Sequence, residues 1–176
     1  MAAVLMASVA ASAQNETGQT TIAPTVGLNL SNTTGDGSKM MPVLAVGAVG
    51  EYGVMDNLGV SAGVMFSMQG AKADGSDRKL KMNYLNIPIL ANYYVWQGLA
   101  VKAGVQPGFL LSAKNDDADI KSDCKKLDLS IPVGVSYEIS KFVIDARYNI
   151  GLTKMAEYAD DKNSVIQITV GYKFDL

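Results

Sequence analysis

Side chains of alternating character run through most of this chain with a period of two residues. Between Leu127 and Ile139, every odd position is apolar or aromatic, and every even position is polar, small or proline. Successive side chains of a β-strand point to opposite faces, so this alternation predicts a strand with two unlike faces. No helical segment separates the alternating stretches, which predicts an all-β chain. Eight strands are expected, at 22–31, 43–52, 58–69, 82–96, 99–112, 127–139, 142–153 and 164–176.

The connections between these segments alternate between long and short. Long ones are expected at 31–40, 71–79, 114–126 and 155–163, and short ones at 53–57, 97–98 and 140–141. Outer-membrane barrels combine short periplasmic turns with longer outer loops and an even number of strands. The segments also reach the ~9–11 residues that a tilted strand needs to cross a bilayer. The sequence therefore predicts an eight-stranded antiparallel up-and-down transmembrane β-barrel over residues 21–176.

The composition of the two faces indicates which one looks outward. A soluble barrel of the lipocalin kind turns its apolar face inward, and a membrane barrel does the reverse. Here the polar face is rich in glycine, serine, threonine, asparagine and glutamine, which suits a narrow lumen better than a water-exposed surface. The apolar face carries no charge in any strand core, as expected beside lipid, where Lys or Arg costs roughly 2–4 kcal/mol at the midplane. We therefore expect it to face lipid, and a soluble lipocalin-like carrier is the alternative.

Aromatic side chains of the apolar face gather near the short-turn end. Rings at this level form the interfacial girdle of membrane barrels. The predicted girdle consists of Tyr52, Tyr93, Tyr137, Phe142, Tyr172 and Phe174. Trp96 lies at the same level, but strict alternation assigns it to the inward face.

Charged residues of the lumen face gather in the half of the barrel nearest the short turns. Charges removed from water need partners, because desolvation otherwise outweighs their attraction. We predict a neutral interior ion-pair network of three acids and three bases, formed by Glu51, Lys102, Glu138, Asp145, Arg147 and Lys173. Alternation also assigns Asp128 and Asp175 to the lumen, outside this network. The network is either a structural plug or a gate whose pairs exchange, and a third interpretation is that water at the periplasmic mouth solvates the charges.

Residues 1–13 have the character of a secretory signal peptide. An uncharged apolar stretch ends in Ala11-Ser12-Ala13, which predicts cleavage after Ala13. No Lys or Arg precedes the apolar run, so the basic n-region is missing from this signal, and a buried N-terminal helix is the alternative. Residues 14–20 then form a short segment ahead of the barrel.

The composition excludes several classes of function. The chain has 176 residues, a net charge of −2 and no histidine. Near-balanced charge excludes a broad basic surface for nucleic acid. Without histidine there are no Ser–His or Cys–His nucleophile pairs and no histidine metal sites. The single cysteine, Cys124, forms neither an internal disulfide nor a cysteine-rich zinc site, and is expected to be a bystander. We therefore predict no catalytic residue, no cofactor and no metal ion.

Two motifs resemble ligand sites but lack the context that such sites need. The segment 114–126 is rich in aspartate, yet it lacks the spacing, the central glycine and the distal glutamate of an EF-hand. We expect a solvated loop there. The stretch Gly47–Gly53 has the glycines of a nucleotide-binding loop, but no helical pattern follows it.

Three stretches carry a resemblance to a known family: Asn83–Leu90, Ala103–Gly108 and Ile168–Leu176. From about residue 20 onward the chain resembles the small outer-membrane β-barrels common in Bacteroidetes, often called PorT-like, and is similar in plan to OmpX and OmpA. The resemblance implies a place in the bacterial outer membrane, contact with its lipid and lipopolysaccharide, and insertion by the barrel-assembly machinery. That machinery reads the last strand, whose commonest form ends on an aromatic residue, whereas this chain has Phe174 two places before Leu176.

These features together predict a non-enzymatic barrel with a structural or surface-interaction role, carried out by its four long outer loops. The alternative is a narrow pore or a small-solute binder gated by the lumen ion pairs. Since a closed barrel has no free strand edge, we expect a monomer.

Overall fold

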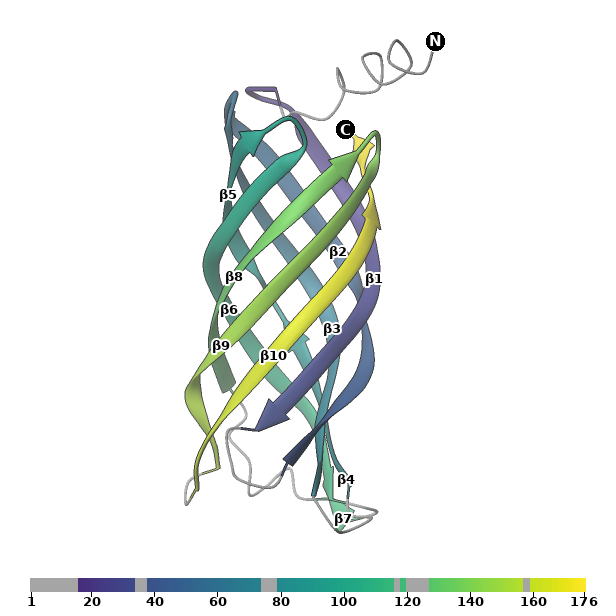
Figure 1. Ribbon diagram of the computed structural model, residues 1–176, viewed down its shortest axis with the longest axis vertical. Helices are drawn as coiled ribbons and strands as arrows, with labels where there is room; N and C mark the ends of the chain where they lie inside the picture. The colour runs from purple at the N-terminus through teal and green to yellow at the C-terminus, as the bar shows by residue number, and fades with distance from the viewer. Residues whose placement is uncertain (1–15, 34–37, 74–78, 116–117, 120–126, 157–158) are drawn as a thin grey trace.

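The computed structural model describes residues 16–33, 38–73, 79–115, 118–119, 127–156 and 159–176. This part of the chain folds into β-strands joined by turns, which form one closed antiparallel barrel (Figure 1). No helix within the described ranges has the length and apolarity that a membrane-spanning helix requires. The predicted signal peptide, residues 1–13, lies outside the described residues.

Closure of the barrel comes from pairing between the first and last long strands. Leu28 of β1 lies opposite Ile168 of β10 in an antiparallel ladder, and every other strand pairs with its neighbours in the same sense. The strands are β1 (Thr20–Thr33), β2 (Ser38–Met55), β3 (Leu58–Ala73), β4 (Lys79–Asn86), β5 (Ile89–Trp96), β6 (Leu99–Asn115), β7 (Ala118–Asp119), β8 (Leu127–Ile139), β9 (Phe142–Ala156), β10 (Ala159–Tyr172) and β11 (Phe174–Asp175). β4 and β5 follow one another along a single line of the wall, and so do β10 and β11. β7 only extends the ladder of β6. The wall therefore has eight strands, as predicted.

The predicted strand 82–96 is interrupted between β4 and β5. The interruption falls at Ile87 and Pro88, because proline has no N–H for the ladder. The surrounding hydrogen bonds persist: the Ile87 N–H donates to the Pro107 carbonyl at 2.8 Å, and the Gly63 N–H donates to the Pro88 carbonyl at 3.0 Å. Both halves therefore stay between the same neighbours, β3 and β6.

The long connections are shorter than predicted, because the strands continue beyond the alternating pattern. Ser38 pairs with Ala73, and Ala156 pairs with Ala159 inside the expected loop 155–163. Alternation marks the part of a strand whose two faces meet different surroundings. The residues of these extensions lack a sustained alternation of apolar and polar types, so the sequence pattern does not show that the ladder continues there.

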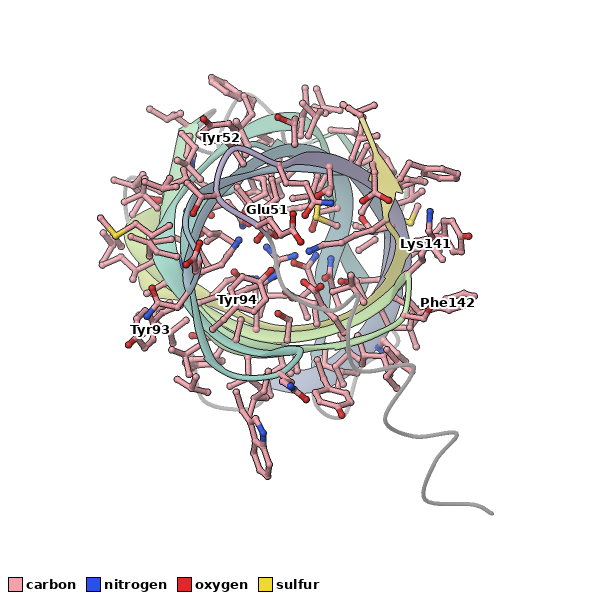
Figure 2. All side chains as sticks on the ribbon, turned by 90° about the horizontal axis from the view of Figure 1, so that it is seen from above. Glu51, Tyr52, Tyr93, Tyr94, Lys141 and Phe142 are labelled. Atoms are coloured by element: carbon pink, nitrogen blue, oxygen red, sulfur yellow. The ribbon has the colours of Figure 1, made fainter. Side chains whose placement is uncertain are left out.

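The two faces of the wall are separated as expected for a membrane barrel. Leu28 and Ile168 are exposed on the outside, whereas their neighbours Asn29 and Gln167 are buried inside. Figure 2 shows side chains both around the barrel and filling its interior. The soluble lipocalin-like alternative, which requires apolar side chains to face inward, is wrong for this chain.

Trp96 corrects one prediction made by strict alternation. The β5–β6 ladder shifts register between Tyr94 and Trp96. Trp96 therefore lies outside, 74% exposed, instead of pointing into the lumen.

Both ends of the described chain lie at the short-turn end (Figure 1). The Gly18 N–H donates to the Gly53 carbonyl at 2.8 Å, and the Thr17 hydroxyl donates to Asp56 at 2.6 Å. These contacts fix the first described residues beside the turn between β2 and β3.

Candidate functional site

The six charged residues predicted to form a network all lie inside the barrel, near its short-turn end. β2 carries Glu51, β6 carries Lys102 and β8 carries Glu138. β9 carries both Asp145 and Arg147, and Lys173 lies between β10 and β11. All six side chains are largely buried, with at most 10% of the side chain exposed. The structure divides them into two groups of three.

The first group lies around Lys173. Its ammonium contacts Glu138 Oε1 directly and lies 3.5 Å from Glu51 Oε2. Tyr94 of β5 joins the same group, with its hydroxyl 2.6 Å from Glu51 Oε1 and 2.7 Å from Glu138 Oε1. A phenol has one proton to donate, so at any moment the Tyr94 hydroxyl donates a hydrogen bond to either Glu51 or Glu138. It lies within hydrogen-bond distance of both carboxylates.

Sequence reasoning missed Tyr94. It points into the lumen, whereas its neighbour Tyr93 points outward (Figure 2). The available signal was a tyrosine on the inward face at the level of three charged residues. A buried tyrosine hydroxyl needs a partner, and the acids at this level provide one.

The second group lies around Asp145. Its Oδ2 accepts a hydrogen bond from Lys102 Nζ at 2.9 Å, and its Oδ1 lies 2.6 Å from Arg147 Nε. Arg147 Nη2 also lies 3.7 Å from the sulfur of Met65. One acid here serves two bases, so this group carries a formal charge of +1, whereas the first group carries −1. The six residues are neutral only when both groups are counted. The opposite net charges of the two groups attract, so burying them close together costs less than burying either group alone.

Glycines provide the space for these long side chains. Gly134 of β8 pairs with Lys102 on one side and with Arg147 on the other. A Cβ atom at Gly134 would overlap the Ala146 carbonyl and would lie 2.8 Å from Arg147 Cγ. Gly59 lies against the Glu51 carboxylate in the same way. The glycine-rich lumen face therefore serves to hold large charged groups inside a narrow barrel.

A small cavity of about 30 Å³ lies between the two groups. Its wall includes Glu51, Lys102, Asp145, Arg147 and Lys173, together with threonine hydroxyls from β1 and β10. This volume holds about two water molecules.

Polar and apolar side chains fill the lumen further from the short turns. Asn29 donates to the Ser67 hydroxyl at 2.7 Å, and Gln106 contacts Ser130. An apolar cluster follows on β4 and β6, formed by Met82, Tyr84, Leu110 and Ala113. The sequence predicted small and polar filling here, so this cluster was missed.

The other two predicted lumen charges differ from each other. Asp128 is partly buried and accepts a hydrogen bond from Thr153. Asp175 is exposed at the rim, where its carboxylate lies 3.4 Å from Lys141 Nζ and accepts a bond from Gln19. Asp175 is thus a rim residue and not a lumen residue, because it stands opposite Thr21 near the end of the β1–β11 ladder, at the mouth of the barrel.

The predicted girdle residues Tyr52, Tyr93, Tyr137, Phe142, Tyr172 and Phe174 are all exposed on the outer surface. Three of them pack together: the Phe142 and Tyr172 rings lie 5.2 Å apart edge to face, and Tyr172 lies 4.9 Å from Phe174. This contact joins the rings of β9, β10 and β11 into one patch.

No group of three aspartate, glutamate or cysteine side chains that could hold a metal ion occurs among the residues that the structure describes. The aspartate-rich segment 114–126 and Cys124 lie outside the described side chains.

An apolar outer wall, an aromatic band at one end and a charged interior define a β-barrel membrane protein. Residues 12–157 match the family model for the outer membrane protein beta-barrel domain. The chain therefore belongs to this family, and its place is the bacterial outer membrane. No curated protein shows a significant match to the chain.

Several solved outer-membrane barrels share the fold. Ail, the attachment invasion locus protein of Yersinia pestis, has a TM-score of 0.60 and 18% identity over 90% of this chain and 99% of its own. Neisserial surface protein A has a TM-score of 0.55 and 14% identity, covering 88% of this chain and 97% of its own. OprG from Pseudomonas aeruginosa has a TM-score of 0.52 and 14% identity, covering 91% and 97%. At these identities the likeness shows the fold alone.

Proposed function

We propose that this protein is a non-enzymatic outer-membrane barrel, sealed in its periplasmic half, that acts at the cell surface through the outer ends of its strands. The observation that carries the proposal is the ion-pair network across the lumen. It leaves a cavity of about 30 Å³, which is room for about two water molecules and too little for a nutrient-sized solute. A sealed barrel of this kind is a stable support for the segments that it presents outside.

The outer connections support contact with mixed polar surfaces. The segments 31–40, 71–79, 114–126 and 155–163 hold acidic and basic residues in nearly equal numbers. Ail has been solved with a heparin analogue, sucrose octasulfate, but balanced charge does not favour such a polyanion here. Lipopolysaccharide and outer-membrane lipid, with their mixture of sugars and phosphates, are the partners that we propose.

Two measurements test this function together. Trypsin added to intact cells should cut within 114–126 and leave the barrel protected, as expected if these segments lie outside. Vesicles containing the purified protein should not swell in isotonic solutions of a small sugar, whereas vesicles with a large-pore porin should. Rapid swelling would contradict the sealed barrel, and protection of 114–126 in intact cells would contradict the surface role.

A narrow pore gated by the network is the second candidate. It is favoured by the shared ions: Lys173 contacts both Glu51 and Glu138, and Asp145 contacts both Lys102 and Arg147. A shared ion can exchange partners without becoming unpaired. If the network gates a pore, Glu138→Gln should increase sugar uptake by the vesicles. If it seals the barrel, the same substitution should lower stability without uptake.

The remaining assignments concern maturation and relationship. The stretches 83–90, 103–108 and 168–176 support placing the chain among the PorT-like barrels of Bacteroidetes. We propose that residues 1–13 are removed as a signal peptide, that the barrel-insertion machinery reads the last strand, and that the mature protein is a monomer. Mass measurement of the mature protein should give a chain that begins at Gln14.

A further inference from the structure

The charge on the wall of the lumen cavity differs from the charge of the whole network. Lys102, Arg147 and Lys173 line the cavity, against the acids Glu51 and Asp145. Glu138 belongs to the network but does not line the cavity. The wall therefore has a formal charge of +1, although the six residues together are neutral. A positive wall favours a negative occupant over a cation.

Hydrogen-bond donors on this wall still have capacity. Arg147 is 4% exposed, and its Nη1 has no hydrogen-bond partner among the described residues. The buried Thr25 hydroxyl, on the same wall, also has none within that part of the chain. Lys102 uses one of its three N–H groups on Asp145. Buried donors of this kind are usually satisfied, by protein, water or an ion.

We propose that the cavity binds one small monovalent inorganic anion, of which chloride is the simplest. The guanidinium of Arg147, the ammonium of Lys102 and the hydroxyl of Thr25 donate to it. The volume of about 30 Å³ suits a single ion slightly larger than water. A sulfate ion is disfavoured because its two negative charges exceed the single net positive charge of the wall. This inference goes beyond the surface role, and it holds whether or not the outer segments bind a partner.

The direct test uses bromide as the probe. Crystals of the full barrel grown in sodium bromide should show an anomalous difference peak in contact with Arg147 and Thr25. Bromide peaks on the outer surface alone would mean an adventitious ion only, and would overturn the proposal. Electron density in the cavity without an anomalous signal would show that water occupies it, and would also overturn the proposal.

A second test measures stability in detergent solution at constant ionic strength. An ion that binds the folded state alone raises the unfolding midpoint with its concentration. Bromide and chloride should therefore raise the midpoint relative to gluconate, which is too large to enter, and sulfate should not. Equal midpoints in chloride and gluconate would contradict the proposal.

Two variants connect this effect to the cavity. Thr25→Val keeps the shape of the side chain but removes a donor, and should weaken bromide binding about fivefold. Arg147→Lys keeps the charge but removes Nη1, and should weaken it more than about tenfold. Ser136→Ala is the matched control, because Ser136 also has a buried hydroxyl without a partner among the described residues and does not line the cavity. Loss of the halide effect in Ser136→Ala, or its full retention in both other variants, would refute the site.

Discussion

The hydroxyl of Tyr94 lies 2.6 Å from Oε1 of Glu51, although the two residues are 43 positions apart in the chain. They lie on β5 and β2, with β3 between them in the sheet. The contact crosses the lumen side of β3, where Gly59 leaves room for the Glu51 carboxylate. It shows how the lower lumen is filled: long side chains reach over glycines to partners that are not on adjacent strands.

Tyr94→Phe removes only the hydroxyl that links the two carboxylates. Because a hydrogen bond to a charged group is worth about 1.5–3 kcal/mol, we expect the free energy of unfolding in lipid vesicles to fall by a similar amount. Tyr93→Phe is the matched control, since Tyr93 is the neighbouring residue and faces outward. Urea titration followed by Trp96 fluorescence measures both. Equal losses in the two variants would show that Tyr94 has no special role.

Lys173→Met leaves the acids Glu51 and Glu138 without their shared cation. Removing one partner of a buried ion pair typically costs about 3–5 kcal/mol, and we expect a loss of this size from urea unfolding. Adding Glu138→Gln should restore part of it, because one of the unpaired charges is then removed. Lys141→Met is the control: its pair with Asp175 is about half exposed and should matter by less than about 1 kcal/mol. If Lys173→Met lost as little stability as the Lys141→Met control, the buried ion-pair network would be contradicted.

Gly134→Ala tests whether glycine is required where charged side chains cross the wall. The added Cβ would overlap the Ala146 carbonyl and the Arg147 side chain, so we expect a loss of about 1–3 kcal/mol from overpacking. At Gly50 the nearest atom to a new Cβ is 3.7 Å away, and Gly50→Ala should change stability by less than about 0.5 kcal/mol. The temperature at which each variant loses its compact mobility on gels gives the order. The reverse order would overturn the packing argument.

Arginine substitutions along the outer face of β8 test the position of the bilayer. Val133 lies near the middle of the strand and Leu127 at its outer end, and both are exposed on the barrel wall. Val133→Arg should cost about 2–4 kcal/mol and Leu127→Arg about 0–1 kcal/mol, because the cost falls from the midplane to the interface. Folding titrations in vesicles measure the difference. Similar costs at the two positions would contradict the predicted depth.

The fold could be predicted in most of its detail because alternation, turn spacing and glycine content all report on the barrel wall. The identity of the buried charges followed from the same alternation. Their pairing could not be predicted, because it depends on the relative stagger of the strands, which a period of two does not record. Lys102 reaches Asp145 across Gly134, and only the assembled register shows that contact.

The departures from the sequence pattern have local structural causes. Trp96 lies on the outer face, against strict alternation, because the β5–β6 ladder shifts register just before it. The connections are shorter than predicted because the ladders continue into residues whose sequence lacks a sustained alternation. The apolar cluster of Met82, Tyr84, Leu110 and Ala113 was missed. Where both faces of a strand carry apolar residues, the alternation that identifies the lumen face is weak.

Single-channel recording in planar bilayers shows whether the lumen is closed. We propose that two ion-pair groups of opposite net charge close it at its periplasmic half. Purified wild-type protein should therefore insert without producing conductance steps. Long-lived open channels of uniform conductance in the wild-type protein would contradict the closed lumen.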